Sequence, residues 1–164
     1  MRSFVGFPEL VNDKAARVVA AGVAVLSATV LLTGAQWLLA IMALGFALRV
    51  ASGPRFSPLG LVATRLVAPR LGAPVLVAGA PKRFAQGVGL ATTVAASVAG
   101  LALGYHAVGA GLAAVLLTFA TLEAGLGFCA GCWAYGHLIA LGVVPETSCV
   151  ACADISLRRK VVAG

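Results

Sequence analysis

Charged side chains are scarce in this sequence, and acidic ones are the scarcest. The 164 residues include five acidic and twelve basic ones, so that 10% of the chain is charged while 61% is apolar. A soluble domain carries about a quarter charged residues, because polar groups have to cover its surface. This scarcity excludes a water-soluble enzyme, a disordered chain and a small secreted disulfide protein, and it indicates an all-α integral membrane protein.

Two long stretches carry no charge at all, residues 18–48 and 84–122. As one continuous helix the second would extend roughly 58 Å, about twice the thickness of a bilayer core. We therefore expect each stretch to form a hairpin of two spans, with turns at 33–36 and 104–106, where glycine and polar residues interrupt the apolar run. The result is a single membrane domain over residues 1–164, a four-helix bundle of two helical hairpins. Its predicted spans are about 17–33, 36–51, 84–103 and 107–128.

The twelve basic residues fall in three regions, the N-terminus, residues 49–83 and the C-terminal segment. With four spans these regions share one face of the membrane, and the positive-inside rule makes that face cytoplasmic. We therefore expect a bacterial plasma-membrane protein with both termini in the cytoplasm. Because the basic residues alternate with aliphatic ones beside the spans, the expected partner is anionic lipid rather than nucleic acid. The residues expected to face lipid headgroups are Arg65, Arg70, Lys82 and Arg83.

The segment 52–83 is the largest predicted polar element, a basic cytoplasmic loop with five of the seven prolines. Ser57 followed by Pro58 is typical of a helix start. Aliphatic residues follow until Pro69, with Arg65 among them. Two structures fit this pattern equally well, a short amphipathic helix on the inner leaflet and a proline-rich loop folded over the end of the bundle.

The four cysteines carry the most specific chemical signal. They form two C-x-x-C pairs separated by 16 residues, Cys129 with Cys132 and Cys149 with Cys152. The topology places both pairs in a cysteine-rich cytoplasmic cap formed by the tail over 129–164. Stable disulfides are disfavoured in that reducing compartment. Buried cysteines that only fill space are an alternative, but such residues rarely fall into two identical pairs.

Two uses of the cysteines remain open. Two C-x-x-C pairs at this separation match a structural zinc site in which all four thiolates are ligands. The other use is dithiol redox or sulfur-transfer chemistry, in which one thiol of a pair attacks and the other resolves a mixed disulfide. Since residues 145–148 can open a helix, Cys149 is the predicted attacking thiol and Cys152 its resolver. Cys129 and Cys132 are then the second dithiol.

Three stretches also resemble one bacterial membrane family. They are residues 83–86 (Arg-Phe-Ala-Gln), 128–135 (Phe-Cys-Ala-Gly-Cys-Trp-Ala-Tyr) and 144–152 (Val-Pro-Glu-Thr-Ser-Cys-Val-Ala-Cys). The family is filed as domain of unknown function family 4395, and the chain is similar to an actinobacterial member from about residue 14 to 155. The resemblance carries no catalytic residue over, since the activity of the family is uncharacterised. It does imply thioredoxin-like and rhodanese-like proteins encoded nearby, which favours thiol or sulfur chemistry.

Whether the chain is an enzyme stays open. The leading hypothesis is thiol-disulfide or sulfane-sulfur exchange with a soluble thioredoxin-like or rhodanese-like protein. The alternative is a non-enzymatic membrane scaffold with a structural zinc ion. Quinone-reducing four-helix oxidoreductases also combine a bundle with two cysteine pairs, but their cysteines lie on the outer face, opposite to the face predicted here. A transporter is a weaker hypothesis, because so small a chain would have to form a homo-oligomer around its pathway.

Glu123 and Gln86 are the predicted polar residues within the apolar spans. A carboxylate at membrane depth is costly and marks functional sites. However, Glu123 and Cys132 fall on opposite faces of an ideal helix, so pairing of Glu123 with Arg49 or Gln86 is the simpler expectation. His137 could serve as a proton donor or metal ligand, although a histidine at the membrane interface more often does neither.

Overall fold

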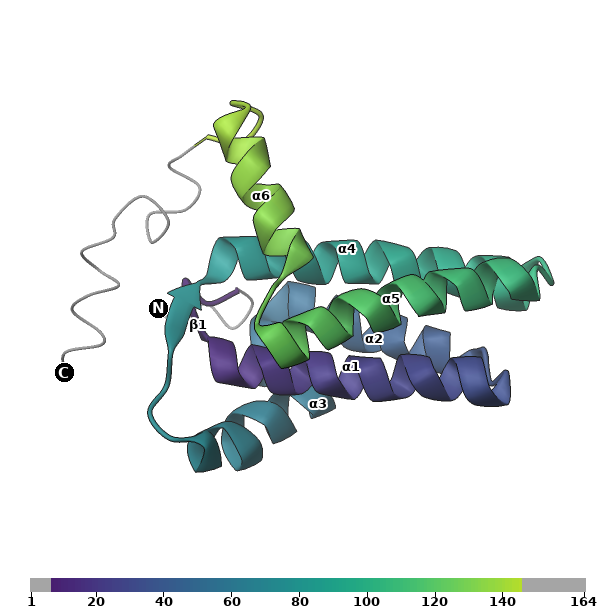
Figure 1. Cartoon of the computed structure of the whole chain (residues 1–164), viewed down its shortest axis with the longest axis horizontal. Coiled ribbons are helices and arrows are strands. Elements are labelled where there is room, and N and C mark those ends of the chain that lie inside the picture. The colour runs from purple at the N-terminus through teal and green to yellow at the C-terminus, as the bar shows by residue number, and fades with distance from the viewer. Residues whose placement is uncertain (1–6, 146–164) are drawn as a thin grey trace.

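The computed structural model describes residues 7–145, and most of that stretch is helical (Figure 1). Four helices run along the long axis of the molecule: α1 (Asp13–Thr33), α2 (Trp37–Ser52), α4 (Gly79–Ser97) and α5 (His106–Leu126). Together with the helical turns that continue α2 and α4, they give four stretches long and apolar enough to cross a membrane. The chain is therefore all-α and compatible with membrane insertion.

Tight turns join the helices within each hairpin. Helix α1 ends at Gly34, which has a φ of 70°, and the turn before α5 contains Gly104 with a φ of 72°. A π-helical turn, η4 (Val98–Ala102), continues α4 toward the second turn. At its other end α4 begins at Gly79, five residues (84 − 79) before the predicted span.

A short antiparallel ladder ties the start of α1 to the start of α4. Strand β1 (Leu10–Asn12) pairs with β2 (Leu76–Ala78), an element that the all-α prediction did not include. The N–H of Asp13 extends the ladder by donating to the carbonyl of Val75 at 2.7 Å. Because each strand runs directly into a helix, the first turns of α1 and α4 lie together at one end of the bundle (Figure 1).

Helical turns occupy most of the predicted basic loop. As expected, Ser57 caps one of them, since its side chain accepts a hydrogen bond from the N–H of Gly60. Ala63 and Ala68 pack on Val19 of α1. The segment is therefore helical, as the interpretation of a short helix predicted. It is also folded onto the bundle, as the interpretation of a folded-back loop predicted. Its elements are η1 (Gly53–Arg55), α3 (Pro58–Val62), η2 (Ala63–Val67) and η3 (Ala68–Leu71).

The main core lies between the four long helices. Helix α1 packs chiefly along α5 and α2 along α4, so the two hairpins interlock rather than stand apart. Small residues on α4 and α5 let the helices approach closely. The buried residues of this core are Val23, Val30, Leu39, Met42, Phe46, Ala96, Ala113, Leu116 and Ala120.

After α5 the chain turns into α6 (Ala130–Ala140), which crosses α4 at a steep angle (Figure 1). Gly131 permits this crossing, because a Cβ there would lie 2.5 Å from the Cβ of Ala85 on α4. Tyr135 continues the contact with its ring 5.5 Å from that of Phe84. The second cysteine pair of the predicted cap lies outside the described residues, so the four-cysteine cap stays a prediction.

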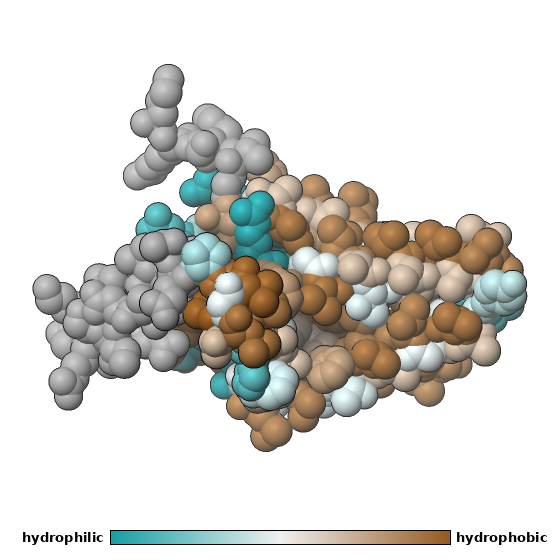
Figure 2. Space-filling view, turned by 90° about the horizontal axis from the view of Figure 1, so that it is seen from above, coloured by the Kyte–Doolittle hydropathy of each residue, from teal (hydrophilic) through white to brown (hydrophobic). Residues whose placement is uncertain are grey.

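The outward faces of the long helices are apolar. Leu32 is 86% exposed and Leu44 61% exposed. Thr29 and Thr118 lie on the same outward faces, and each hydroxyl donates to the carbonyl four residues earlier. No polar group of these threonines therefore needs water, as lipid contact requires. Figure 2 shows an apolar body, with most of the hydrophilic surface toward one end and a smaller hydrophilic patch at the opposite tip.

Candidate functional site

A buried lysine connects three helices at the end of the bundle where α1 and α4 begin. Lys82, in the first turn of α4, is only 6% exposed. Its Nζ lies 3.0 Å from Oδ1 of Asp13, which opens α1, and 2.8 Å from Oε1 of Glu123 near the end of α5. The prediction that Lys82 faces lipid is therefore wrong. Because α4 begins at Gly79, Lys82 belongs to the helix and its side chain points into the bundle.

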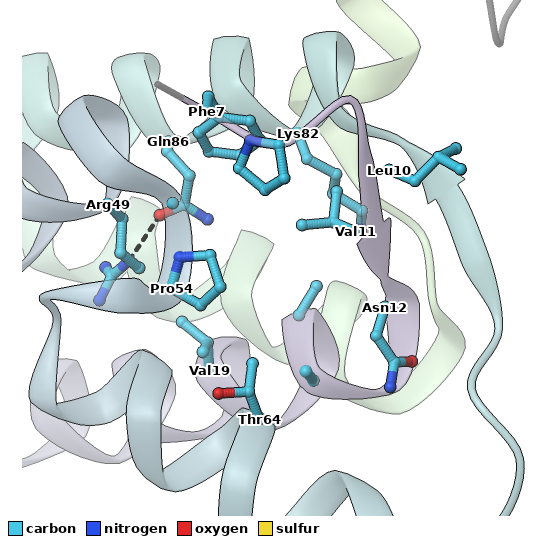
Figure 3. Close-up of a pocket in the computed structure, with 14 residues that line it drawn as sticks. Phe7, Leu10, Val11, Asn12, Val19, Arg49, Pro54, Thr64, Lys82 and Gln86 are labelled. Carbon is cyan, nitrogen blue, oxygen red and sulfur yellow. Dashed lines mark hydrogen bonds between the residues drawn. The ribbon is translucent and has the colours of Figure 1, made fainter. Parts of the chain in front are cut away.

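A second buried cation lies nearby at the end of α2. The Nε of Arg49 donates to Oε1 of Gln86 at 2.7 Å, and its Nη1 donates to Oγ of Ser57 at 3.2 Å. The guanidinium also lies 4.4 Å from the ring centre of Phe46, a cation–π contact. Figure 3 shows the bond between Arg49 and Gln86 at the edge of a cavity of about 140 Å³.

The partner of Glu123 differs from the expected one. Arg49 and Gln86 bind each other, whereas Glu123 binds Lys82, which the earlier start of α4 brings into reach. The carboxylates of Asp13 and Glu123 then balance the two buried cations, Lys82 and Arg49. Balance matters because a buried charge without a partner costs several kcal/mol.

The end of α5 leads directly to the first cysteine pair. Gly127 terminates α5 with a φ of 71°, a left-handed conformation that glycine adopts without strain. Two residues later, Cys129 is the N-cap of α6. Cys132 lies in the first turn of α6, three residues after Cys129. Cys129 is buried and Cys132 is partly exposed.

The two sulfurs of this pair differ in acidity, and both lie outside the membrane-spanning helices. The pKa of Cys129 is lowered, chiefly because the Cys132 thiol donates a hydrogen bond to it. The ammonium group of Lys82 acts in the same direction, while burial and Glu123 oppose it. The pKa of Cys132 is raised, because its proton is held in the bond to Cys129 and because the side chain is partly buried. Cys129 is therefore the sulfur that ionises first, as is usual for a cysteine at a helix N-terminus.

Cys129 borders a cavity of about 310 Å³ that reaches into the bundle. Its walls come from α1, α2, α4, α5 and the start of α6, and they are mostly apolar. Gln86 and Glu123 are the polar side chains of the wall other than Cys129 itself. The larger apolar lining residues are Val19, Val23, Phe46, Phe84, Leu116 and Phe119. The site thus joins a thiol of lowered pKa, a second thiol three residues later and an apolar space.

A family model described as domain of unknown function (DUF4395) matches residues 11–140. The chain belongs to this family. The matched region contains the buried ion pairs and the pair of Cys129 and Cys132, and it ends before Cys149. No curated protein and no solved structure matches the chain. The description of DUF4395 assigns no activity, so a function has to be argued from the site.

The other predicted site residues of this DUF4395 chain lie away from the cysteine pair. Arg65, Arg70 and Arg83 are exposed, and their contact with lipid headgroups stays a prediction. His137 lies on α6 with its Nδ1 3.1 Å from the carbonyl oxygen of Trp133 and its ring centre 4.1 Å from that of Trp133. These contacts place His137 on the helix surface. A role as proton donor or metal ligand stays a prediction.

The proposed zinc ligands are only half described. Cys149 and Cys152 lie outside the described residues, 7–145, whereas Cys129 and Cys132 lie within them. Within residues 7–145, no group of three or more His, Cys, Asp or Glu side chains is arranged to hold a metal ion. The four-thiolate zinc site therefore stays a prediction.

Asp13 is the member of the buried ion cluster that the sequence analysis missed, and Lys82 is the member that it placed wrongly. One signal pointed to Lys82, since it precedes Gln86 by four residues and would share a face with it on a helix that began earlier. No local signal places Asp13 beside Lys82. Their contact depends on the pairing of two strands of three residues each, which are too short to recognise in a sequence.

Proposed function

We propose that this protein exchanges electrons or sulfane sulfur with soluble thiol proteins at the surface of a bacterial plasma membrane, through Cys129 and Cys132. The observation that carries the proposal is the geometry at the start of α6, where Cys129 is the N-cap and Cys132 lies in the first turn. In this pair the pKa of Cys129 is lowered and that of Cys132 is raised, which favours Cys129 as the thiolate. A thiolate is the nucleophile of such reactions, and a second thiol within reach resolves the intermediate. The distribution of basic residues supports a cytoplasmic location for the pair and for both termini.

Exchange with a disulfide proceeds in two steps. The thiolate of Cys129 attacks one sulfur of the partner's disulfide, whose S–S bond breaks so that its other sulfur leaves as a thiolate. Cys132 passes its proton to that thiolate and attacks the sulfur of Cys129, which breaks the mixed disulfide and releases the partner's second sulfur. The partner gains two electrons, and Cys129 and Cys132 become a disulfide. The reverse sequence reduces the pair.

A persulfide would react at the same sulfur. Cys129 attacks the terminal sulfur of the persulfide, the partner's S–S bond breaks, and the partner leaves as a thiolate while Cys129 keeps the sulfane sulfur. A thioredoxin-like partner suits the first reaction and a rhodanese-like partner the second. In this proposal Cys149 and Cys152 form a further dithiol of the tail, with Cys149 attacking and Cys152 resolving.

A redox titration of the isolated first pair tests the proposal. The protein with Cys149→Ser and Cys152→Ser, in lipid nanodiscs, is equilibrated with glutathione buffers, quenched with acid and labelled with a thiol-reactive mass tag. We expect one reversible transition in which both tags are lost together. Adding Cys132→Ser should trap glutathione on Cys129, whereas the matched Cys129→Ser protein should trap little. Thiols that stay reduced in every buffer, or trapping on Cys132 alone, would contradict the proposal.

A structural zinc site is the second candidate function, and the spacing of the four cysteines favours it. All four thiolates would bind one ion and hold the tail against the start of α6, in a scaffold without enzymatic activity. The full chain, purified without chelator, distinguishes the two functions. One zinc ion per chain with all four thiols protected from labelling supports the scaffold. A metal-free chain with a reversibly oxidised pair supports exchange.

A further inference from the structure

The cavity beside Cys129 extends along the membrane-spanning helices. Its lining runs from Ala16 to Val23 on α1 and from Leu116 to Glu123 on α5, a depth of roughly 10 Å at 1.5 Å per residue. A soluble protein partner reaches the end of the bundle but not this depth. The proposed exchange with soluble partners therefore leaves most of the cavity without a role.

The cavity also borders the lipid-facing surface. Val88 on α4 and Phe119 on α5 both line it, and they are 47% and 49% exposed. Exposed apolar residues on these helices face the acyl chains of a bilayer. A ligand dissolved in the membrane can thus approach the cavity from the side, without crossing water.

We propose that this cavity binds the ring of a membrane-soluble quinone, which accepts two electrons from Cys129 and Cys132. The proposal rests on the proposed function, and it names the electron acceptor of the same pair. Three phenylalanines in the wall suit a flat ring, because aromatic rings stack in offset or edge-to-face contacts. In an otherwise apolar wall, the amide nitrogen of Gln86 can donate a hydrogen bond to a ring oxygen, and the carboxylate of Glu123 can accept one from a hydroxyl of the quinol. The volume of about 310 Å³ lies at the lower end of the range of small-molecule sites.

The reaction balances without a further reagent. The thiolate of Cys129 adds to a ring carbon and forms a C–S bond. Cys132 gives up its proton and attacks the sulfur of Cys129, so that an S–S bond forms, the C–S bond breaks and its electron pair stays on the ring. The ring takes up the two protons of the former thiols and leaves as a quinol. Electrons thus run from a reduced soluble partner, through Cys129 and Cys132, into the membrane.

Anaerobic oxidation by a short-chain quinone tests this site. The protein with Cys149→Ser and Cys152→Ser is reduced, freed of reductant and mixed with the quinone, and both quinol absorbance and thiol tags are followed. We expect one quinol for each disulfide. Ala134→Phe, which fills the cavity from α6, should slow the reaction by about tenfold or more, equivalent to a loss of binding of about 1.4 kcal/mol. The exposed Ala140→Phe on the same helix is the matched control and should react as the parent does.

Parallel oxidation by glutathione disulfide separates the outcomes. Slower quinone reduction with unchanged glutathione exchange in Ala134→Phe supports the site, and the smaller Ala134→Leu should then give an intermediate rate. Equal quinone rates in Ala134→Phe and Ala140→Phe would overturn it, as expected if the cavity held only a lipid acyl chain. Glutathione exchange without any quinol would overturn the quinone site and leave the proposed function standing. Failure with both oxidants would overturn the proposed function itself.

Discussion

The two ends of the bundle are held together by different chemistry. At the end with the two interhelical turns, Nε2 of Gln36 donates to the carbonyl of His106 at 2.8 Å, and its Oε1 lies 3.3 Å from Nδ1 of His106. At the opposite end, Lys82 binds Asp13 and Glu123. One end therefore joins the hairpins through a neutral amide, and the other joins them through balanced charges.

The two ends therefore differ in whether their contacts can affect the ionisation of a neighbouring thiol. The amide of Gln36 provides a hydrogen bond for the backbone carbonyl of His106 without adding a net charge. The contact therefore stabilises that end of the bundle without bringing a charge near any thiol. The charged end lies beside Cys129, where Lys82 lowers the pKa of the thiol and Glu123 raises it. A buried ion cluster is costly to assemble, and this one lies beside a thiol whose pKa it affects in addition to the larger effect of Cys132.

Removal of the central cation should have the largest effect. Lys82→Ala leaves the partly buried carboxylates of Asp13 and Glu123 without their partner, and breaking a buried pair in this way costs up to about 3–5 kcal/mol. We expect a loss of that size in the free energy of unfolding, measured with sodium dodecyl sulfate in mixed micelles. Arg83→Ala is the matched control, because Arg83 directly follows Lys82 in the chain and its side chain is exposed. This variant should change the free energy of unfolding by less than about 0.5 kcal/mol. Similar losses in the two variants would contradict the burial of the cluster.

Removal of the amide at the other end should have a smaller effect. Gln36 is 8% exposed and fills space left by Gly100 and Gly109. Gln36→Leu keeps much of that volume but leaves the carbonyl of His106 without its donor, which should cost about 1–3 kcal/mol in the same unfolding assay. Tyr105→Phe, at an exposed neighbouring position, is the control. The rate of Cys129 alkylation should be unchanged in Gln36→Leu, because the two ends act separately. A shift in the pH dependence of that rate would show that the two ends are coupled.

The smallest effect is expected between the ends, at Ser27 on α1. Ser27 is fully buried, and its hydroxyl has no hydrogen-bond partner among residues 7–145. Ser27→Ala removes an unsatisfied polar group and should leave stability unchanged or raise it by up to about 1 kcal/mol. Thr93, equally buried, donates its hydroxyl to the carbonyl of Gly89 at 2.8 Å, so Thr93→Val should lower stability by about 1 kcal/mol. Unfolding midpoints that move in the same direction would contradict this difference.

The neutral end is the one that sequence patterns describe well. A membrane helix needs about 20 apolar residues, so the uncharged runs and the interruptions at Gly34 and Gly104 indicated four helices and where they turn. The cap at Ser57, which lies at the opposite end beside Arg49, could also be predicted, because it depends on the neighbouring Pro58 and Gly60 alone. Each of these features depends on residues close together in the chain.

The charged end depends on contacts between distant residues. Lys82 meets Asp13 and Glu123 only because the short strands align α1 with α4 and start α4 at Gly79. The sequence alone placed Lys82 in a basic loop, because the preceding Pro81 and the following Arg83 are typical of a loop. The cysteine spacing indicated a reactive pair, but the acidity of Cys129 depends on how α6 begins and on Lys82, which no spacing reveals.

The rate of Cys129 alkylation against pH tests the central claim most directly. In the protein with Cys149→Ser and Cys152→Ser, an ordinary thiol would reach half its maximal rate near pH 8.5, the usual pKa of about 8.5 for cysteine. Because the pKa of Cys129 is lowered, chiefly by the Cys132 thiol, its thiolate persists at lower pH, and the midpoint should fall below that value. The midpoint should rise in Cys132→Ala, since alanine has no side-chain proton to donate. A midpoint at or above about 8.5, or faster labelling of Cys132 than of Cys129, would contradict the account.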